Sequence, residues 1–168
     1  MSYSDPKEQF TAAVAAATGL LAAKHVVVKL LKVRARVGSH EEAWKEDEHF
    51  LQRTLLGRTL SAAFLPYGPL TSKQAVERLA GLEDNIATNE PILLLAAAAY
   101  GSAADPATLK AIGLPLLLTA VACRFVHTTS FLTYPHSQPW RALSWTGGLA
   151  GTLYFGVVAA ATYWRALY

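Results

Sequence analysis

The chain has 168 residues, enough for one domain, and only 16% of them are charged, against roughly 25% in soluble domains. Its net charge of +3 at pH 7 comes without a one-signed basic stripe, so we expect no nucleic-acid partner. The single cysteine, Cys123, excludes an intramolecular disulfide.

The first predicted helix covers about residues 9–33. It is apolar from Phe10 to Ala23, and the apolar pattern resumes after basic residues interrupt it. A membrane-spanning helix needs about 20 mostly apolar residues, and lysines near its end can extend their charged heads to the interface. We therefore expect a span in which Lys24, Lys29 and Lys32 reach toward water.

Charged residues are concentrated in the next segment, residues 34–71, which we predict to be a surface loop. Within it, residues 41–53 have the composition of a short amphipathic helix. Arginines and lysines are frequent here and scarce near residues 104–106, between the second and third predicted helices. By the positive-inside rule, this loop faces the cytoplasm or an equivalent compartment, and both termini face away.

The second predicted helix covers about residues 72–104, with an N-cap at Thr71 or Ser72 and Pro91 in its interior. The third covers about residues 106–134 and continues from a strongly apolar core into Arg124 and His127. The fourth covers about residues 142–165 and has no charged residue before its last position. The chain is therefore expected to be all-α: a single domain, residues 1–168, forming an integral membrane four-helix bundle.

Ionisable residues inside a membrane are candidates for function. Arg124 and His127 are three residues apart and so share one helix face. Two interpretations stay open: an anion site between helices, or a buried arginine paired with a carboxylate of the second helix, such as Glu77, Glu83 or Glu90. Asn85, on that second helix, could bond between helices or contact a ligand. We expect no metal site, because His127 has no second ligand at useful helical spacing.

Gly147 and Gly151 form a GxxxG pattern in the fourth helix. This pattern permits close approach of another helix, either within the bundle or between subunits.

Three motifs resemble those of the MAPEG superfamily, the membrane-associated proteins of eicosanoid and glutathione metabolism. They are residues 76–78 with Asn85, residues 124–128 and residues 138–144, in this order and on the expected helices. The branch that the chain resembles is that of the microsomal glutathione transferases and prostaglandin E synthases. More faintly, Lys24 precedes Arg36 at the family's usual distance.

The resemblance implies a homotrimer of four-helix subunits that binds glutathione between neighbouring subunits. The matching ligand-binding residues are Arg36, Asn85, Arg124 and His127. Arg141 would be catalytic, lying nearest the sulfur, where a cation favours thiolate over thiol. A lipophilic electrophile or peroxide dissolved in the bilayer would be the second substrate.

The sequence departs from the family pattern on both sides of Asn85. A basic residue, an acidic residue and a glutamate are replaced by Asp84, Ile86 and Thr88, and a helix-3 tyrosine by Phe131. Two hypotheses follow: a glutathione-dependent transferase or peroxidase with a partly degenerate site, or a non-catalytic structural subunit of a larger membrane complex. The family resemblance implies the endoplasmic reticulum, with a mitochondrial membrane as the alternative.

Overall fold

A computed structural model describes residues 5–38, 73–132 and 138–168. The predicted amphipathic helix at residues 41–53, the N-cap at Thr71 or Ser72 and the end of the third helix at residues 133–134 lie outside these ranges. All secondary structure in the described residues is helical, as the sequence predicts.

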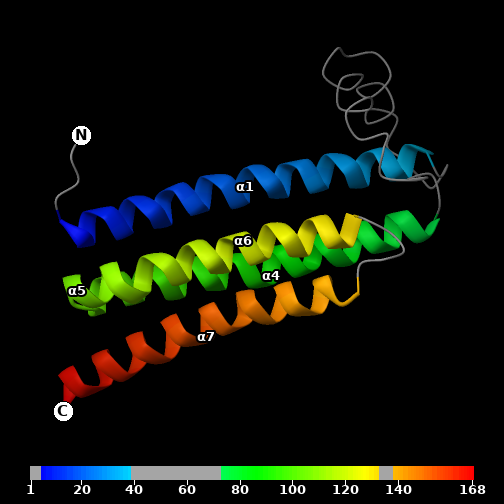
Figure 1. The fold of residues 1–168 in the computed structure, drawn as a ribbon. Coiled ribbons are helices and arrows are strands. Elements are labelled where there is room, and N and C mark those ends of the chain that lie inside the picture. Colours follow the sequence, from blue (N-terminus) through cyan, green and yellow to red (C-terminus); the bar gives the residue numbers. More distant parts are fainter. Residues whose placement is uncertain (1–4, 39–72, 133–137) are drawn as a thin grey trace.

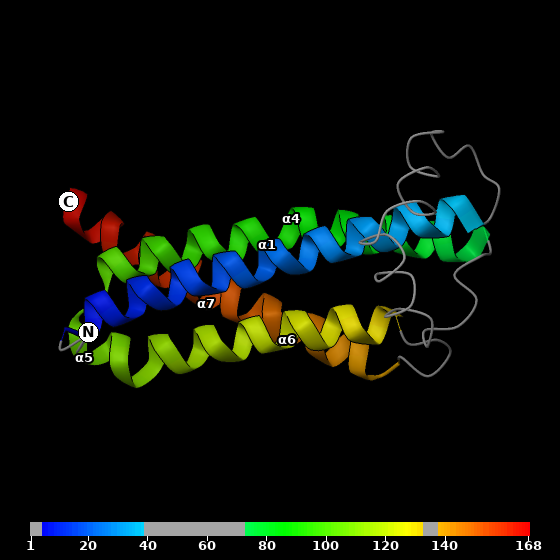
Figure 2. The ribbon, with the colours of Figure 1, turned by 90° about the horizontal axis from the view of Figure 1, so that it is seen from above.

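Four long helices run up and down the bundle in turn, so that each is antiparallel to the next in the chain (Figure 1): α1 (Pro6–Gly38), α4 (Lys73–Ala103), α6 (Leu114–Leu132) and α7 (Trp140–Leu167). The short α5 (Pro106–Thr108) and the π-helical η2 (Leu109–Gly113) connect α4 to α6. The start of α1, the short α5 and the end of α7 lie at one end of the bundle (Figures 1 and 2). Helix α4 packs against both α1 and α7, while α6 packs mainly against α7.

Helix α1 is longer than the sequence predicted, because residues 34–38, assigned to the charged loop, continue it. In this extension Ala35 is buried, and it packs with Leu31 of α1 against Val76 and Leu79 of α4. The apolar contact with α4 stabilises the extra turns. The sequence did not predict them, because Ala35 lies between two charged residues. At the other end of the chain, α7 begins at Trp140, two residues before the predicted start.

The largest core cluster fills the end of the bundle where α1 begins. Phe10 lies with its ring 5.9 Å from Tyr100 and 6.2 Å from Phe155, measured between centroids. Edge-on and tilted arrangements of this kind are favourable for aromatic pairs. Gly101 and Gly113 make room for these rings, since a Cβ on either would come within 3 Å of an aromatic carbon. This packing fixes how α1, α4 and η2 meet.

Three helical segments are long and apolar enough to cross a membrane: Pro6–Val33, Pro106–Leu132 and Trp140–Leu167. They are compatible with an integral membrane protein. We expected four spans from the sequence, and α4 does not meet the same measure of length and composition. The reason is that charged residues occupy its first half, and only the stretch after Pro91 is continuously apolar.

The GxxxG pattern is used inside the bundle. A Cβ on Gly147 would lie 2.7 Å from Sγ of Cys123, and one on Gly151 would lie 2.9 Å from Cβ of Ala120. Both glycines therefore allow α7 to approach α6 closely, so the pattern serves helix packing within the bundle.

Candidate functional site

Three charged side chains from three helices meet inside the bundle. Lys24 of α1, Glu90 of α4 and Arg124 of α6 are each less than one-tenth exposed. The Lys24 ammonium donates a hydrogen bond to Glu90 and another, of 3.3 Å, to the backbone carbonyl of Arg124. The expectation that Lys24 extends to the interface is therefore wrong, because a buried carboxylate lies within its reach.

Glu90 is the carboxylate of α4 that lies within electrostatic range of Arg124. Of the alternatives considered from the sequence, Glu83 instead pairs with Lys32 at 2.5 Å and Lys29 at 3.7 Å, and Glu77 is exposed. Lys24 thus forms an ion pair with Glu90, and Arg124 is a second buried cation within electrostatic range of the same carboxylate. Such a group carries a net positive charge in surroundings where an uncompensated charge is costly.

Gly148 provides the space for the Arg124 side chain. A Cβ at this position would lie 2.8 Å from Cδ of Arg124 and 3.4 Å from one of its terminal nitrogens. The arginine therefore lies flat against the backbone of α7, and the glycine that permits this is the residue after the first glycine of the GxxxG pattern.

His127 lies one turn further along α6 and is 4% exposed. Its Nδ1 is 3.2 Å from the backbone carbonyl oxygen of Arg141. A carbonyl only accepts, so we assign the proton of the neutral ring to Nδ1, which leaves Nε2 as an acceptor. Nε2 is buried and has no hydrogen-bond partner among the described residues. The structure therefore holds a buried basic nitrogen whose lone pair is available.

Arg141 lies in the first turn of α7 and is half-buried. Its guanidinium carbon is 4.9 Å from the ring centroid of Phe131, a cation–π contact, and the same ring lies 5.3 Å from that of His127. The hydroxyl of Ser144 also donates to the Arg141 carbonyl, at 3.2 Å. Phe131 thus forms the apolar contact between the histidine and the arginine.

The predicted site residues are only partly brought together. Arg124, His127 and Arg141 form one cluster. Asn85 lies on α4 five residues from Glu90, and its Oδ1 is buried without a partner among the described residues. Arg36 lies twelve residues beyond Lys24 on α1, which places it about 18 Å further along the helix axis.

The residues around Asn85 have different surroundings. Asp84 and Thr88 are exposed. Ile86 is buried with Val28 and Leu82, and Phe131 packs against this cluster. The isoleucine thus serves packing between α1 and α4, whereas the side chains of Asp84 and Thr88 are exposed and can be substituted without disturbing the core.

Comparisons with protein families, curated proteins and solved structures found no match to this chain.

Proposed function

We propose that this chain is an integral membrane protein of the MAPEG type that uses glutathione to conjugate or reduce lipophilic electrophiles. The observation that carries the proposal is the buried, unpartnered Nε2 of His127 beside two arginines. A basic nitrogen next to cations is the environment in which a thiol gives up its proton.

The arrangement fits the thiol end of glutathione better than its ammonium end. Arg141 is half-exposed, so its guanidinium can turn toward a ligand, and Nε2 of His127 can accept a hydrogen bond. For the ammonium group, the nearest buried carboxylate is Glu90, which is already bonded to Lys24. The expected consequence is glutathione binding weaker than a site with a free carboxylate would give.

Bound glutathione supplies a sulfur nucleophile for attack on an electrophile or peroxide. The Arg141 guanidinium stabilises negative charge on that sulfur, and Nε2 of His127 accepts the thiol proton. The backbone carbonyl of Arg141 fixes the His127 ring through Nδ1, so the accepting nitrogen is held in one orientation. Arg124 contributes positive charge from inside the bundle. Asn85 and Arg36 are proposed to help orient the tripeptide.

In this proposal α4 is a fourth span, despite its charged first half. The ion pairs of Glu83 and Glu90 with lysines of α1 offset the cost of these charges. Single cysteines replacing Glu8, Ala107 and Gln138, in a Cys123→Ser background, test this topology. Positions 8 and 107 should react from one side of the membrane and position 138 from the other. Reaction of positions 8 and 107 from opposite sides would contradict a spanning α4.

We further propose a homotrimer or incorporation into a larger membrane complex, in the endoplasmic reticulum or alternatively a mitochondrial membrane. The second substrate would be a lipophilic small molecule delivered by the bilayer. Mass measurement of the protein in nanodiscs tests the assembly, and a monomer that retains activity would contradict it.

Conjugation of a chromogenic electrophile tests the enzymatic proposal. Detergent-solubilised protein should catalyse glutathione-dependent conjugation, and Arg141→Ala should abolish it. Arg165→Ala, an exposed arginine at the far end of the same helix, is the matched control and should retain activity. Equal loss in both variants, or none in either, would contradict the role of Arg141.

The alternative is a non-catalytic structural subunit of a larger membrane complex. The observation that favours it is that Arg124 and Lys24 are used in packing, one against Gly148 and the other on Glu90. A chain without conjugating activity that co-purifies with a stable membrane assembly would support this function over the first.

A further inference from the structure

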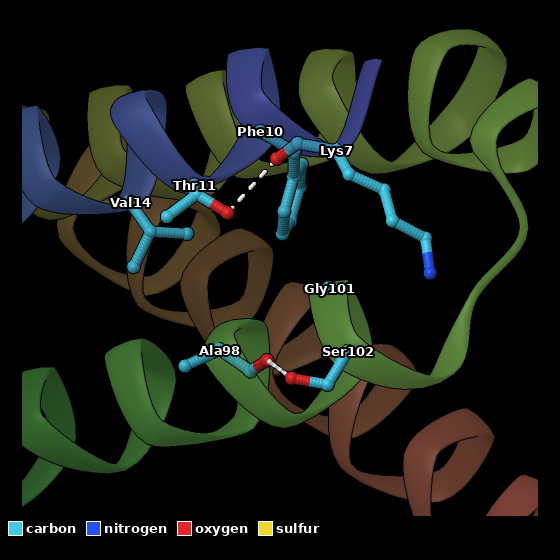
Figure 3. A pocket seen from close by; sticks show the side chains of 7 residues that line it. All are labelled: Lys7, Phe10, Thr11, Val14, Ala98, Gly101 and Ser102. Atoms are coloured by element: carbon cyan, nitrogen blue, oxygen red, sulfur yellow. Dashed lines mark hydrogen bonds between the residues drawn. The ribbon is translucent and has the colours of Figure 1, made fainter. Parts of the chain in front are cut away.

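A groove lies between the start of α1 and the end of α4. It is at the opposite end of the bundle from the last turns of α1 and the first turns of α4. Its volume is about 360 Å³, within the range of roughly 300–1,000 Å³ typical of small-molecule sites. Figure 3 shows Lys7, Phe10, Thr11 and Val14 of α1 on one side, with Ala98 and Ser102 of α4 on the other.

The walls of the groove are apolar, with one cation at the rim. Phe10, Val14 and Ala98 provide the apolar surface. The two hydroxyls already donate to backbone carbonyls: Thr11 to Lys7 at 2.8 Å and Ser102 to Ala98 at 3.2 Å. Among the side chains that line the groove, the Lys7 ammonium therefore holds the hydrogens still available to an anion.

The acidic residues near Lys7 either form another contact or are exposed at the surface. Asp5 accepts a hydrogen bond from the Lys7 backbone N–H, at 2.8 Å, and so caps α1. Glu8 is exposed, and no described acidic side chain forms an ion pair with Lys7. The positive end of the α1 macrodipole lies at the same place.

The groove changes from a polar rim at Lys7 to an apolar interior at Val14, along the axis of α1. The span Pro6–Val33 begins beside Lys7, so this residue lies at the level where a spanning helix meets the headgroups. Val14 is seven residues further along α1, about 10 Å deeper. A ligand that fits must carry an anionic group at one end and a hydrocarbon chain at the other.

We propose that this groove binds one glycerophospholipid, with its phosphate at Lys7 and an acyl chain along Val14 and Ala98, and that it prefers a net anionic headgroup. The site does not depend on the proposed enzymatic function, because Lys7 lies about 25 Å along α1 from Lys24.

Native mass spectrometry of protein released from nanodiscs tests this lipid site. The nanodiscs would contain equal amounts of phosphatidylglycerol and phosphatidylcholine with matched acyl chains. The native protein should retain one phosphatidylglycerol in preference to phosphatidylcholine. Lys7→Gln should reduce that retention about fivefold, the effect expected for one lysine at an anionic membrane surface.

Two further variants separate the lipid site from general surface charge. Lys110→Gln removes another exposed lysine, on η2 at the same end of the bundle, and should leave retention unchanged. Ala98→Phe fills the groove from an exposed position and should abolish retention of both lipids, while circular dichroism confirms an unchanged helix content.

The proposal would be overturned if both lipids were retained equally, or if Lys7→Gln and Lys110→Gln had the same effect. It would also be overturned if no phospholipid were retained and Val14→Cys, in a Cys123→Ser background, formed a disulfide between two chains. That result would assign the groove to a second copy of the protein.

Discussion

Replacing Glu90 by glutamine should destabilise the bundle strongly, because it leaves two buried cations without a carboxylate. Lys24 and Arg124 are 7% and 4% exposed, and both lie within range of Glu90. Removing one member of a buried ion pair typically costs about 3–5 kcal/mol. At roughly 2–4 °C per kcal/mol for a chain of this size, the melting temperature should fall by about 6–20 °C.

The reciprocal substitution, Lys24→Met, should cost less. It removes a charge-assisted hydrogen bond, worth about 1.5–3 kcal/mol, but leaves Glu90 to compensate Arg124. Glu83→Gln is the matched control, since its bridge to Lys32 is about one-fifth exposed, more than the bridge of Lys24 to Glu90, and should contribute less to stability.

Thermal unfolding of detergent-solubilised protein, followed by tryptophan fluorescence, measures all three variants. The expected order of destabilisation is Glu90→Gln, then Lys24→Met, then Glu83→Gln. If Lys24→Met were the most harmful, or if Glu90→Gln melted like the native protein, the two-cation, one-carboxylate description would be refuted.

Gly148→Ala should destabilise by about 1–3 kcal/mol, because its Cβ would press on the buried Arg124 side chain, whereas Gly156→Ala, with nothing within 4 Å, should be stabilising by about 0.5–1 kcal/mol. Equal effects of these two changes in thermal unfolding would contradict the packing. Asp84→Arg with Thr88→Glu, both at exposed positions, should tighten glutathione binding measured by titration; no gain would favour the structural-subunit function. Hydrogen bonds from the hydroxyl and backbone N–H of Thr108 lower the pKa of Asp105 below its ordinary value of 3.8. Its stabilisation of the α5 turn is therefore present above pH 3.8 and lost as the pH falls through the lowered pKa, and Asp105→Asn should remove that acid dependence from unfolding curves.

The sequence predicted the helices well because long apolar runs have few alternatives. Three of them are long and apolar enough to span a membrane. The extra turns of α1 were missed because Arg34 and Arg36 made this segment look like part of the charged loop, whereas Ala35 between them packs against α4. The composition of residues 34–38 does not reveal their contact with α4, which lies about forty positions further along the chain.

Two residues of the buried cluster could be singled out from the sequence, but their contacts could not. Arg124 and His127 stand out in an apolar helix, and their three-residue spacing puts them on one face. The partner of Lys24 could not be found, because residues 39–72 separate α1 from α4 and leave the register of the two helices undetermined. Equally, nothing in the sequence connects His127 to the backbone carbonyl of Arg141, since that bond depends on how α7 packs on α6.

Isothermal titration of the detergent-solubilised protein with glutathione tests the central claim most directly. The native protein should bind glutathione saturably, and Arg141→Ala and His127→Phe should each weaken binding, while Arg165→Ala should bind like the native chain. Absence of any binding heat from the folded native protein, across concentrations up to the solubility limit of the ligand, would contradict the glutathione-dependent function.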